Sequence, residues 1–237
     1  MSEEALVYVE RNELRELFKT KLVNAGLPNY LADKTADLMI FADERGIHSH
    51  GSVRTQYYAE RIAKKGLNLD PQFNFEQTGP STGTYFGDNT VGHYVAYEAM
   101  EKAITLAEDS GIGMVGVKEI GHSGAIGYFA EQAAKRGMVA LTVCQSDPMV
   151  VPFGGTEPYF GTNPIAFAAP RENGEPILFD MATTVQAWGK ILDARSKNKS
   201  IPDTWAVDKN GEPTTDPFEV GALLPVAGPK EIGRAHV

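Results

Sequence analysis

Gly111-Ile-Gly-Met-Val-Gly116 has the glycine spacing of a dinucleotide-binding fingerprint, but its neighbours argue against a Rossmann fold. That fingerprint needs a strand before it and a helix after it, so that a pyrophosphate meets the helix N-terminus. Here the order is reversed. Apolar residues at helical spacing, from Val91 to Ala107, precede the glycines, and an apolar run over 114–117 follows them. We therefore interpret the glycines as a helix stop and a tight turn, and the run as a buried strand.

Helical and strand patterns continue to alternate toward the C-terminus. The apolar spacing predicts helices at 125–136 and 185–192, and strands at 138–143, 165–168 and 177–179 that extend the sheet. Residues 205–224 have the pattern of a hairpin that turns at Asp208-Lys-Asn-Gly211, because Asn-Gly supplies the positive φ angles of a tight turn. The alternation predicts an α/β fold.

The N-terminal part has a different character. Apolar residues at three- and four-residue spacing predict helices at about 14–25, 31–42 and 53–64. After Gly66 the pattern becomes β-prone, at 73–75 and 82–86, and Gly87-Asp-Asn89 favours a turn. We expect a helical N-terminal domain, residues 1–68, and an α/β domain, residues 69–230.

Composition limits the classes of partner. The 237 residues carry 22 Lys and Arg against 31 Asp and Glu, a net charge of −9, with no basic cluster to bind nucleic acid. Cys144 is the only cysteine, so an intrachain disulfide is impossible and a reducing cytoplasm fits. The sequence shows neither an export signal nor an apolar run that could span a membrane.

Two histidines in His48-Ser-His50 have a spacing that can place two imidazoles on one metal ion. Their context argues against a metal, because a helix pattern precedes them and no later run of His and Asp supplies further ligands. With Ser49 and Arg54 the pair could instead bind a small anion, since Arg matches a carboxylate with two parallel donors. A solvated loop of ordinary polar residues fits the spacing equally well.

His122, in Gly121-His-Ser-Gly124, follows a predicted strand, where α/β folds often carry their chemistry. A histidine that titrates near neutrality is the usual general acid or base. Asp147 follows the next strand and could orient that imidazole. A capping aspartate and an incidental histidine explain the pattern just as well.

Glycines also gather in Pro152-Phe-Gly-Gly155 and Gly161-Thr-Asn-Pro164. Such residues allow a backbone to approach a ligand closely. An irregular turn accounts for them equally well, because Asn-Pro is itself a turn signal.

Together these motifs resemble the malate/L-lactate dehydrogenase family of the non-Rossmann, sulfolactate dehydrogenase-like type, and within it the branch that oxidises ureidoglycolate. The motifs that carry the resemblance are DERGIHSHG at 43–51, GHSGA at 121–125, CQSDPMVVPFGG at 144–155, YFGTNP at 159–164 and FDMATTVQAWGK at 179–190. The resemblance implies the family's own mixed-sheet α/β fold. It also implies a homodimer, and the single cysteine fits a cytoplasmic location.

The activity implied by the resemblance is NAD-dependent oxidation of (S)-ureidoglycolate to oxalurate in the breakdown of allantoin. His122 matches the family's catalytic base and Asp147 its orienting carboxylate. The substrate-binding positions match Ser49, His50, Arg54 and Tyr58. The cofactor-contact positions match Ser146, Thr162, Asn163, Asp180, Met181, Ala182 and Lys230. No position implies a metal.

Alternatives remain within and outside this family. Arg54 and His122 would serve any 2-hydroxy or 2-imino acid, so malate, lactate or a cyclic imine carboxylate could be the substrate. NADP could replace NAD, because the residues alone name no acidic ribose-binding position. A metal-dependent hydrolase at His48 and His50, or a non-catalytic binding protein, would be a different class.

The last seven residues, EIGRAHV at 231–237, depart from the family pattern after Gly-Pro-Lys230. We expect them to be a foreign tail translated from a sequencing-adapter string, and the chain to lack the C-terminal part of a family subunit. A chain shortened in this way would expose core surface, so we expect it to be insoluble or inactive.

Overall fold

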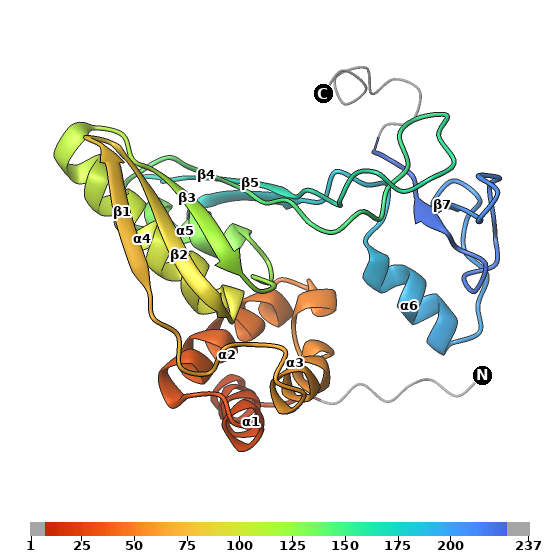
Figure 1. Cartoon of the computed structure of the whole chain (residues 1–237), viewed down its shortest axis with the longest axis horizontal. Helices are drawn as coiled ribbons and strands as arrows, with labels where there is room; N and C mark the ends of the chain where they lie inside the picture. Colours follow the sequence, from red (N-terminus) through yellow and green to blue (C-terminus); the bar gives the residue numbers. More distant parts are fainter. Residues whose placement is uncertain (1–7, 227–237) are drawn as a thin grey trace. The chain divides into compact units, whose positions relative to one another are not determined.

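The computed structural model describes residues 8–226, as helices and strands that divide into two compact units (Figure 1). The first unit covers Met1–Ala133 and the second Ala134–Val237. The predicted tail and Lys230 therefore lie outside the described residues. The expected division at residue 68 differs from this one, because the second N-terminal helix packs against the helix at 92–110.

Three helices open the first unit: α1 (Arg11–Asn24), α2 (Asn29–Glu44) and α3 (Arg54–Ala63). A short 3-10 turn, η1 (His48–His50), joins the last two. The helix α1 packs against α2 and α3, and the buried side chains include Phe18, Leu22 and Ile62. These positions confirm the helical spacing that the sequence predicts.

The first unit also holds a three-stranded sheet. The strands of this sheet are β1 (Asn74–Gly79), β2 (Thr82–Thr90) and β3 (Met114–Ile120). The helix α4 (Gly92–Ser110) precedes β3, and α5 (Gly127–Ala134) follows it. The strand β2 pairs antiparallel with β1 and parallel with β3, and α4 crosses over between β2 and β3 (Figure 1). Gly111 ends α4 with φ +83°, which confirms the predicted helix stop.

Some local predictions in this unit need correction. The run predicted as a buried strand is the start of a longer strand with one exposed face, since Met114 is 66% exposed while Val115 and Val117 pack against the core. The turn expected at 87–89 is a kink within β2, where Asp88 and Asn89 have positive φ and the pairing register shifts.

The second unit has a three-stranded antiparallel sheet. Its order is β4 (Ala140–Val143), β5 (Ile165–Ala169) and β6 (Ile177–Met181), and these strands pair with one another instead of extending the first sheet. The helix predicted at 185–192 lies later, as α6 (Trp188–Ser196). The strands β7 (Ala206–Val207) and β8 (Ala222–Leu223) pair antiparallel, with the predicted turn at Gly211 between them.

Among residues 8–226, no helix is long and apolar enough to cross a membrane.

Candidate active site

Asp43, near the end of α2, organises the loop that carries His48 and His50. One carboxylate oxygen lies 3.0 Å from Nδ1 of His48, and the other accepts the backbone N–H of Ser52 at 2.7 Å. A side chain at Gly51 would place its Cβ 2.0 Å from Oδ1 of Asp43, so it would displace this carboxylate. The exposed His48 thus helps to hold the loop through its contact with the Asp43 carboxylate.

Ser49, in the same loop, contacts both His50 and Arg54. Nδ1 of His50 lies 2.9 Å from the Ser49 hydroxyl, and Nε of Arg54 donates to the Ser49 carbonyl at 2.7 Å. The two terminal amino groups of Arg54 have no hydrogen bond to another described residue. They are therefore free to bind a carboxylate through two parallel bonds.

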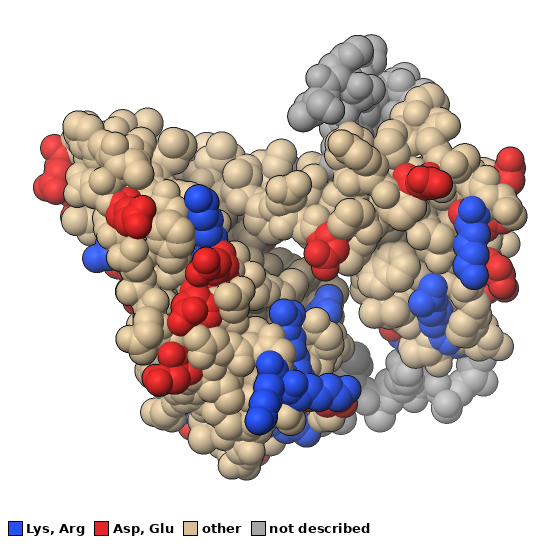
Figure 2. All heavy atoms as spheres, in the orientation of Figure 1, with Lys and Arg blue, Asp and Glu red and all other residues tan. Residues whose placement is uncertain are grey.

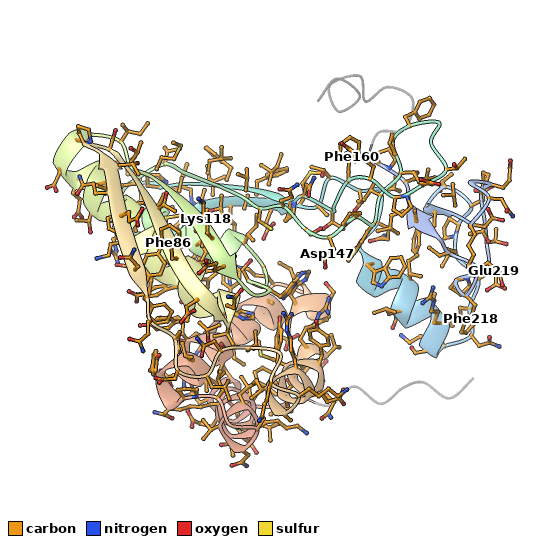
Figure 3. All side chains as sticks on the ribbon, in the orientation of Figure 1. Phe86, Lys118, Asp147, Phe160, Phe218 and Glu219 are labelled. Atoms are coloured by element: carbon orange, nitrogen blue, oxygen red, sulfur yellow. The ribbon has the colours of Figure 1, made fainter. Side chains whose placement is uncertain are left out.

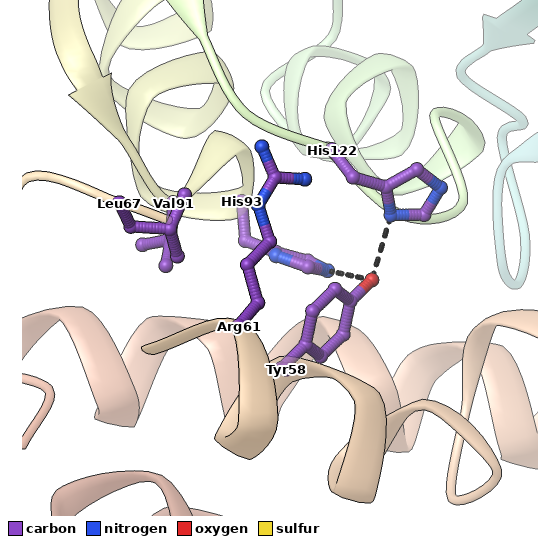
Figure 4. Close-up of a pocket in the computed structure, with 6 residues that line it drawn as sticks. All are labelled: Tyr58, Arg61, Leu67, Val91, His93 and His122. Atoms are coloured by element: carbon purple, nitrogen blue, oxygen red, sulfur yellow. Dashed lines mark hydrogen bonds between the residues drawn. The ribbon is translucent and has the colours of Figure 1, made fainter. Parts of the chain in front are cut away.

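His122 lies beside Tyr58 of α3, although 64 residues separate them in sequence. The Tyr58 hydroxyl lies 2.7 Å from Nδ1 of His122, while the ring of His50 stacks on the His122 ring at 5.5 Å. Figure 4 shows the other ring nitrogen, Nε2, directed away from Tyr58 and His93. The burial of His122 as a residue is low, so part of its surface meets solvent.

The surroundings of each of these imidazole rings lower its pKa and so keep it neutral at pH 7. Loss of hydration lowers the pKa of His50 to about 4 and that of His93 to about 3. The pKa of His122 is also lowered, first by desolvation and then by the charges of His93 and His50. Desolvation raises the pKa of Tyr58, which stays protonated. His122 is therefore unprotonated at ordinary pH, which is the form that a general base must have before it reacts.

A small cavity of about 10 Å³ lies behind this group, near the minimum that a water molecule occupies (Figure 4). Its lining residues are Tyr58, Arg61, Leu67, Val91, His93 and His122. Basic side chains gather over the part of this unit where α3 lies (Figure 2). They give the region a positive local charge in a chain whose net charge is −9.

The structure thus brings together five of the predicted site residues within the first unit: Ser49, His50, Arg54, Tyr58 and His122. It adds His93, which the sequence did not single out. One feature of the sequence could have indicated His93: it lies at the start of an apolar helix, where a buried histidine needs a polar neighbour.

A second polar cluster lies in the second unit, where β4 ends and β5 begins. The Ser146 hydroxyl lies 3.1 Å from that of Thr162, and the backbone N–H of Ser146 donates to the Asn163 side chain at 3.2 Å. Thr183, after β6, donates through its hydroxyl to the carbonyls of Thr162 and Asn163. The predicted cofactor positions 180–182 lie at the end of β6. They are near this cluster, because Met181 pairs with Ile165 at the start of β5.

Asp147 lies on the exposed loop directly after Ser146 (Figure 3). It belongs to the second unit, so its pairing with His122 stays a prediction. In the part of the chain that the structure describes, no group of three or more His, Cys, Asp or Glu could hold a metal ion.

Comparison with known proteins places this geometry in a family. The family model described as malate/L-lactate dehydrogenase matches residues 9–237. The chain belongs to the malate/L-lactate dehydrogenase family. Its structural neighbours share the mixed α/β fold: a dehydrogenase from Sinorhizobium meliloti matches with a TM-score of 0.90 and 31% identity, over 98% of this chain and 69% of the other.

Curated relatives of this family member differ in named activity. An NAD(+) ureidoglycolate dehydrogenase of Escherichia coli O157:H7 is 58% identical over 225 residues, which is 95% of this chain. A malate dehydrogenase of Pyrococcus abyssi is 41% identical over 99% of this chain. The chain spans 64% of the length of the first relative and 65% of the second.

Proposed function

We propose that the protein oxidises (S)-ureidoglycolate to oxalurate with NAD, as a step of allantoin breakdown. Two observations support this. The group around His122 suits a 2-hydroxy acid, because it combines a neutral base with an arginine that has free donors. The choice of ureidoglycolate rests on the 58% identity to a ureidoglycolate dehydrogenase, since Arg54 and His122 would serve any 2-hydroxy acid.

In this proposal Arg54 holds the substrate carboxylate, with Ser49 and His50 beside it. Nε2 of His122 accepts the hydroxyl proton, because Nδ1 is engaged by Tyr58. The bond between carbon and hydrogen breaks, the hydrogen leaves with both electrons as hydride, and the alcohol becomes a carbonyl. The protonated His122 then carries a positive charge that a carboxylate would stabilise, and Asp147 is the residue that we propose for it.

The polar cluster of the second unit fits a dinucleotide. Its donors are hydroxyl and amide groups, which suit ribose and carboxamide oxygens better than a metal. A Cβ at Gly161 would lie 2.3 Å from the Ser146 carbonyl, so the backbone here approaches closely. We propose that Ser146, Thr162, Asn163, Asp180, Met181, Ala182 and Lys230 hold NAD. When bound, NAD supplies the hydride acceptor.

Two variants test the roles of the base and the clamp. His122→Asn is expected to lower kcat by about 10²–10⁴-fold, because the general base is lost. Arg54→Lys is expected to raise KM about tenfold or more with a smaller effect on kcat, because the forked contact is lost. The matched control is Arg11→Lys, at an exposed ion pair with Glu44, which should keep both constants. Equal losses in all three variants would overturn the assignment.

A substrate panel separates the alternatives within the family. Ureidoglycolate, malate, lactate and a cyclic imine carboxylate are offered with NAD and with NADP, and reduced nicotinamide is followed by its absorbance. We expect turnover with ureidoglycolate and NAD. A preference for malate would move the substrate to that of the relative from Pyrococcus abyssi. Bound zinc, together with hydrolysis of the substrate that a chelator abolishes, would favour the metal-dependent hydrolase instead.

We also propose that the protein works as a homodimer in the cytoplasm. The single cysteine and the acidic composition are compatible with that compartment. Light scattering coupled to gel filtration tests the dimer, and a monomeric mass across the concentration range would contradict it.

A further inference from the structure

His93 lies buried behind Tyr58, outside the groups used in the proposed reaction. It is the second residue of α4 and only 1% exposed. Its ring meets the Tyr58 ring edge-on at 5.1 Å and the His122 ring at 6.2 Å. A buried imidazole normally has a hydrogen-bond partner, and the described partner of His93 is the Tyr58 hydroxyl, 3.5 Å from Nε2.

The neighbouring loop makes room for this nitrogen. Gly124 has φ +76°, and a Cβ there would lie 2.7 Å from Nε2 of His93. The loop can therefore close over His93 only because position 124 is glycine.

The Tyr58 hydroxyl has one proton and two imidazole neighbours (Figure 4). If Tyr58 donates to Nδ1 of His122, the proton of that neutral ring must sit on Nε2, which then cannot act as a base. If Tyr58 donates to Nε2 of His93 instead, it can accept the Nδ1–H of His122. Nε2 of His122 then keeps its lone pair.

We propose that His93 is a positioning residue that sets the tautomer of His122 through Tyr58. The hydrogen bonds run from Nδ1–H of His122 to the Tyr58 oxygen, and from the Tyr58 hydroxyl to Nε2 of His93. This arrangement satisfies the buried Nε2 of His93 and leaves His122 ready to accept a proton. The inference rests on the proposed function for its purpose, but the tautomer itself is measurable without any turnover.

The test is long-range ¹H–¹⁵N NMR of the whole chain with ¹⁵N-labelled histidine, because the nitrogen shifts distinguish protonated from unprotonated ring nitrogens. His122→Asn assigns the His122 signals by removing them. We expect protonated Nδ1 and unprotonated Nε2 in the unchanged protein. In His93→Phe, which fills similar space without an acceptor, we expect the His122 proton to shift to Nε2.

His93→Gln is the matched control, because its side-chain carbonyl can accept the Tyr58 proton, and it is expected to restore the original tautomer. In the turnover assay, His93→Phe should lower kcat about tenfold with little change in KM, and His93→Gln should recover most of it. An Nε2-protonated His122 in the unchanged protein, or an identical tautomer in His93→Phe, would overturn the inference. An inactive protein with the expected tautomers would instead count against the proposed function alone.

Discussion

The imidazoles of the first unit are placed by contacts that no local pattern reveals. The loop position of His122 indicated chemistry, and the anion-binding interpretation of His50 and Arg54 was one of several that the spacing allowed. The family resemblance placed Tyr58 at the same site as His122, but no local pattern did so, and nothing indicated His93, which lies at the start of α4. Their proximity depends on how these helices pack, which periodicity does not encode.

Burial of His93 makes stability depend on pH. Its pKa is about 3 in the folded protein, against an ordinary value of about 6.5 in the unfolded chain. Between these values the unfolded chain binds a proton that the folded protein does not, so the free energy of unfolding falls as pH falls through this window. For this single group the loss from pH 7 to pH 5 is about 2 kcal/mol.

We therefore expect His93→Gln to remove about 2 kcal/mol of the pH dependence between pH 7 and pH 5, measured by urea unfolding. Asn24→Gln is the control, because that side chain is exposed and carries no titrating group, so it should keep the pH dependence of the unchanged protein. The prediction is wrong if both variants have the same pH dependence.

The contact between α4 and the loop after β3 fixes the position of His122. A Cβ at Gly92 would lie 2.1 Å from the Gly121 carbonyl oxygen and 2.6 Å from that of His122. Backbone atoms cannot move aside as a flexible side chain can. The first residue of α4 must therefore be glycine for the loop to lie against the helix.

Gly92→Ala is accordingly expected to destabilise the protein by about 1–3 kcal/mol or more, because the added methyl group displaces the loop. Gly116→Ala provides the matched control, since that glycine lies in β3 with open space around it and no positive φ. Thermal unfolding should show a lower Tm for Gly92→Ala only. Similar Tm values for the two variants would show that the loop does not need this contact.

Most helices and strands follow from periodicity, and the misses have physical causes. The helices α1 to α4 have apolar stripes that bury against each other, so their spacing was readable. The run in β3 is half-buried on one face only, because burial is set by what covers each face of a strand and not by the strand itself. Helix α6 begins later than predicted, since Ala187 before it has an extended backbone.

The assignment of strands to sheets was beyond local patterns. Alternation of helix and strand suggested one extended sheet, whereas β1–β3 and β4–β6 form separate sheets in separate units. The family resemblance predicted the mixed α/β class correctly. Pairing between strands depends on long-range contacts, which a single sequence does not specify.

One face of the β4–β6 sheet carries apolar side chains that are exposed. Leu141, Phe167 and Phe179 lie in register across the three strands and are 64%, 38% and 49% exposed. Contiguous apolar surface of this kind binds hydrophobic dyes and favours association. We expect the chain to enhance the fluorescence of anilinonaphthalene sulfonate, and Phe167→Ser to reduce that enhancement.

The control for this prediction is Phe153→Ser, because Phe153 is 60% exposed on a loop outside the sheet. Its replacement should leave dye binding nearly unchanged. Equal reductions in the two variants would mean that the dye does not recognise the sheet face.

Transfer of the hydrogen itself tests the proposed oxidation most directly. Ureidoglycolate that carries deuterium on the hydroxyl-bearing carbon is incubated with the protein and NAD, and the reduced nicotinamide is isolated for mass spectrometry. We predict that the reduced nicotinamide carries the deuterium and that His122→Asn forms almost no reduced nicotinamide. Reduced nicotinamide without deuterium, or no reduction by a folded protein that binds NAD, would contradict hydride transfer from this substrate.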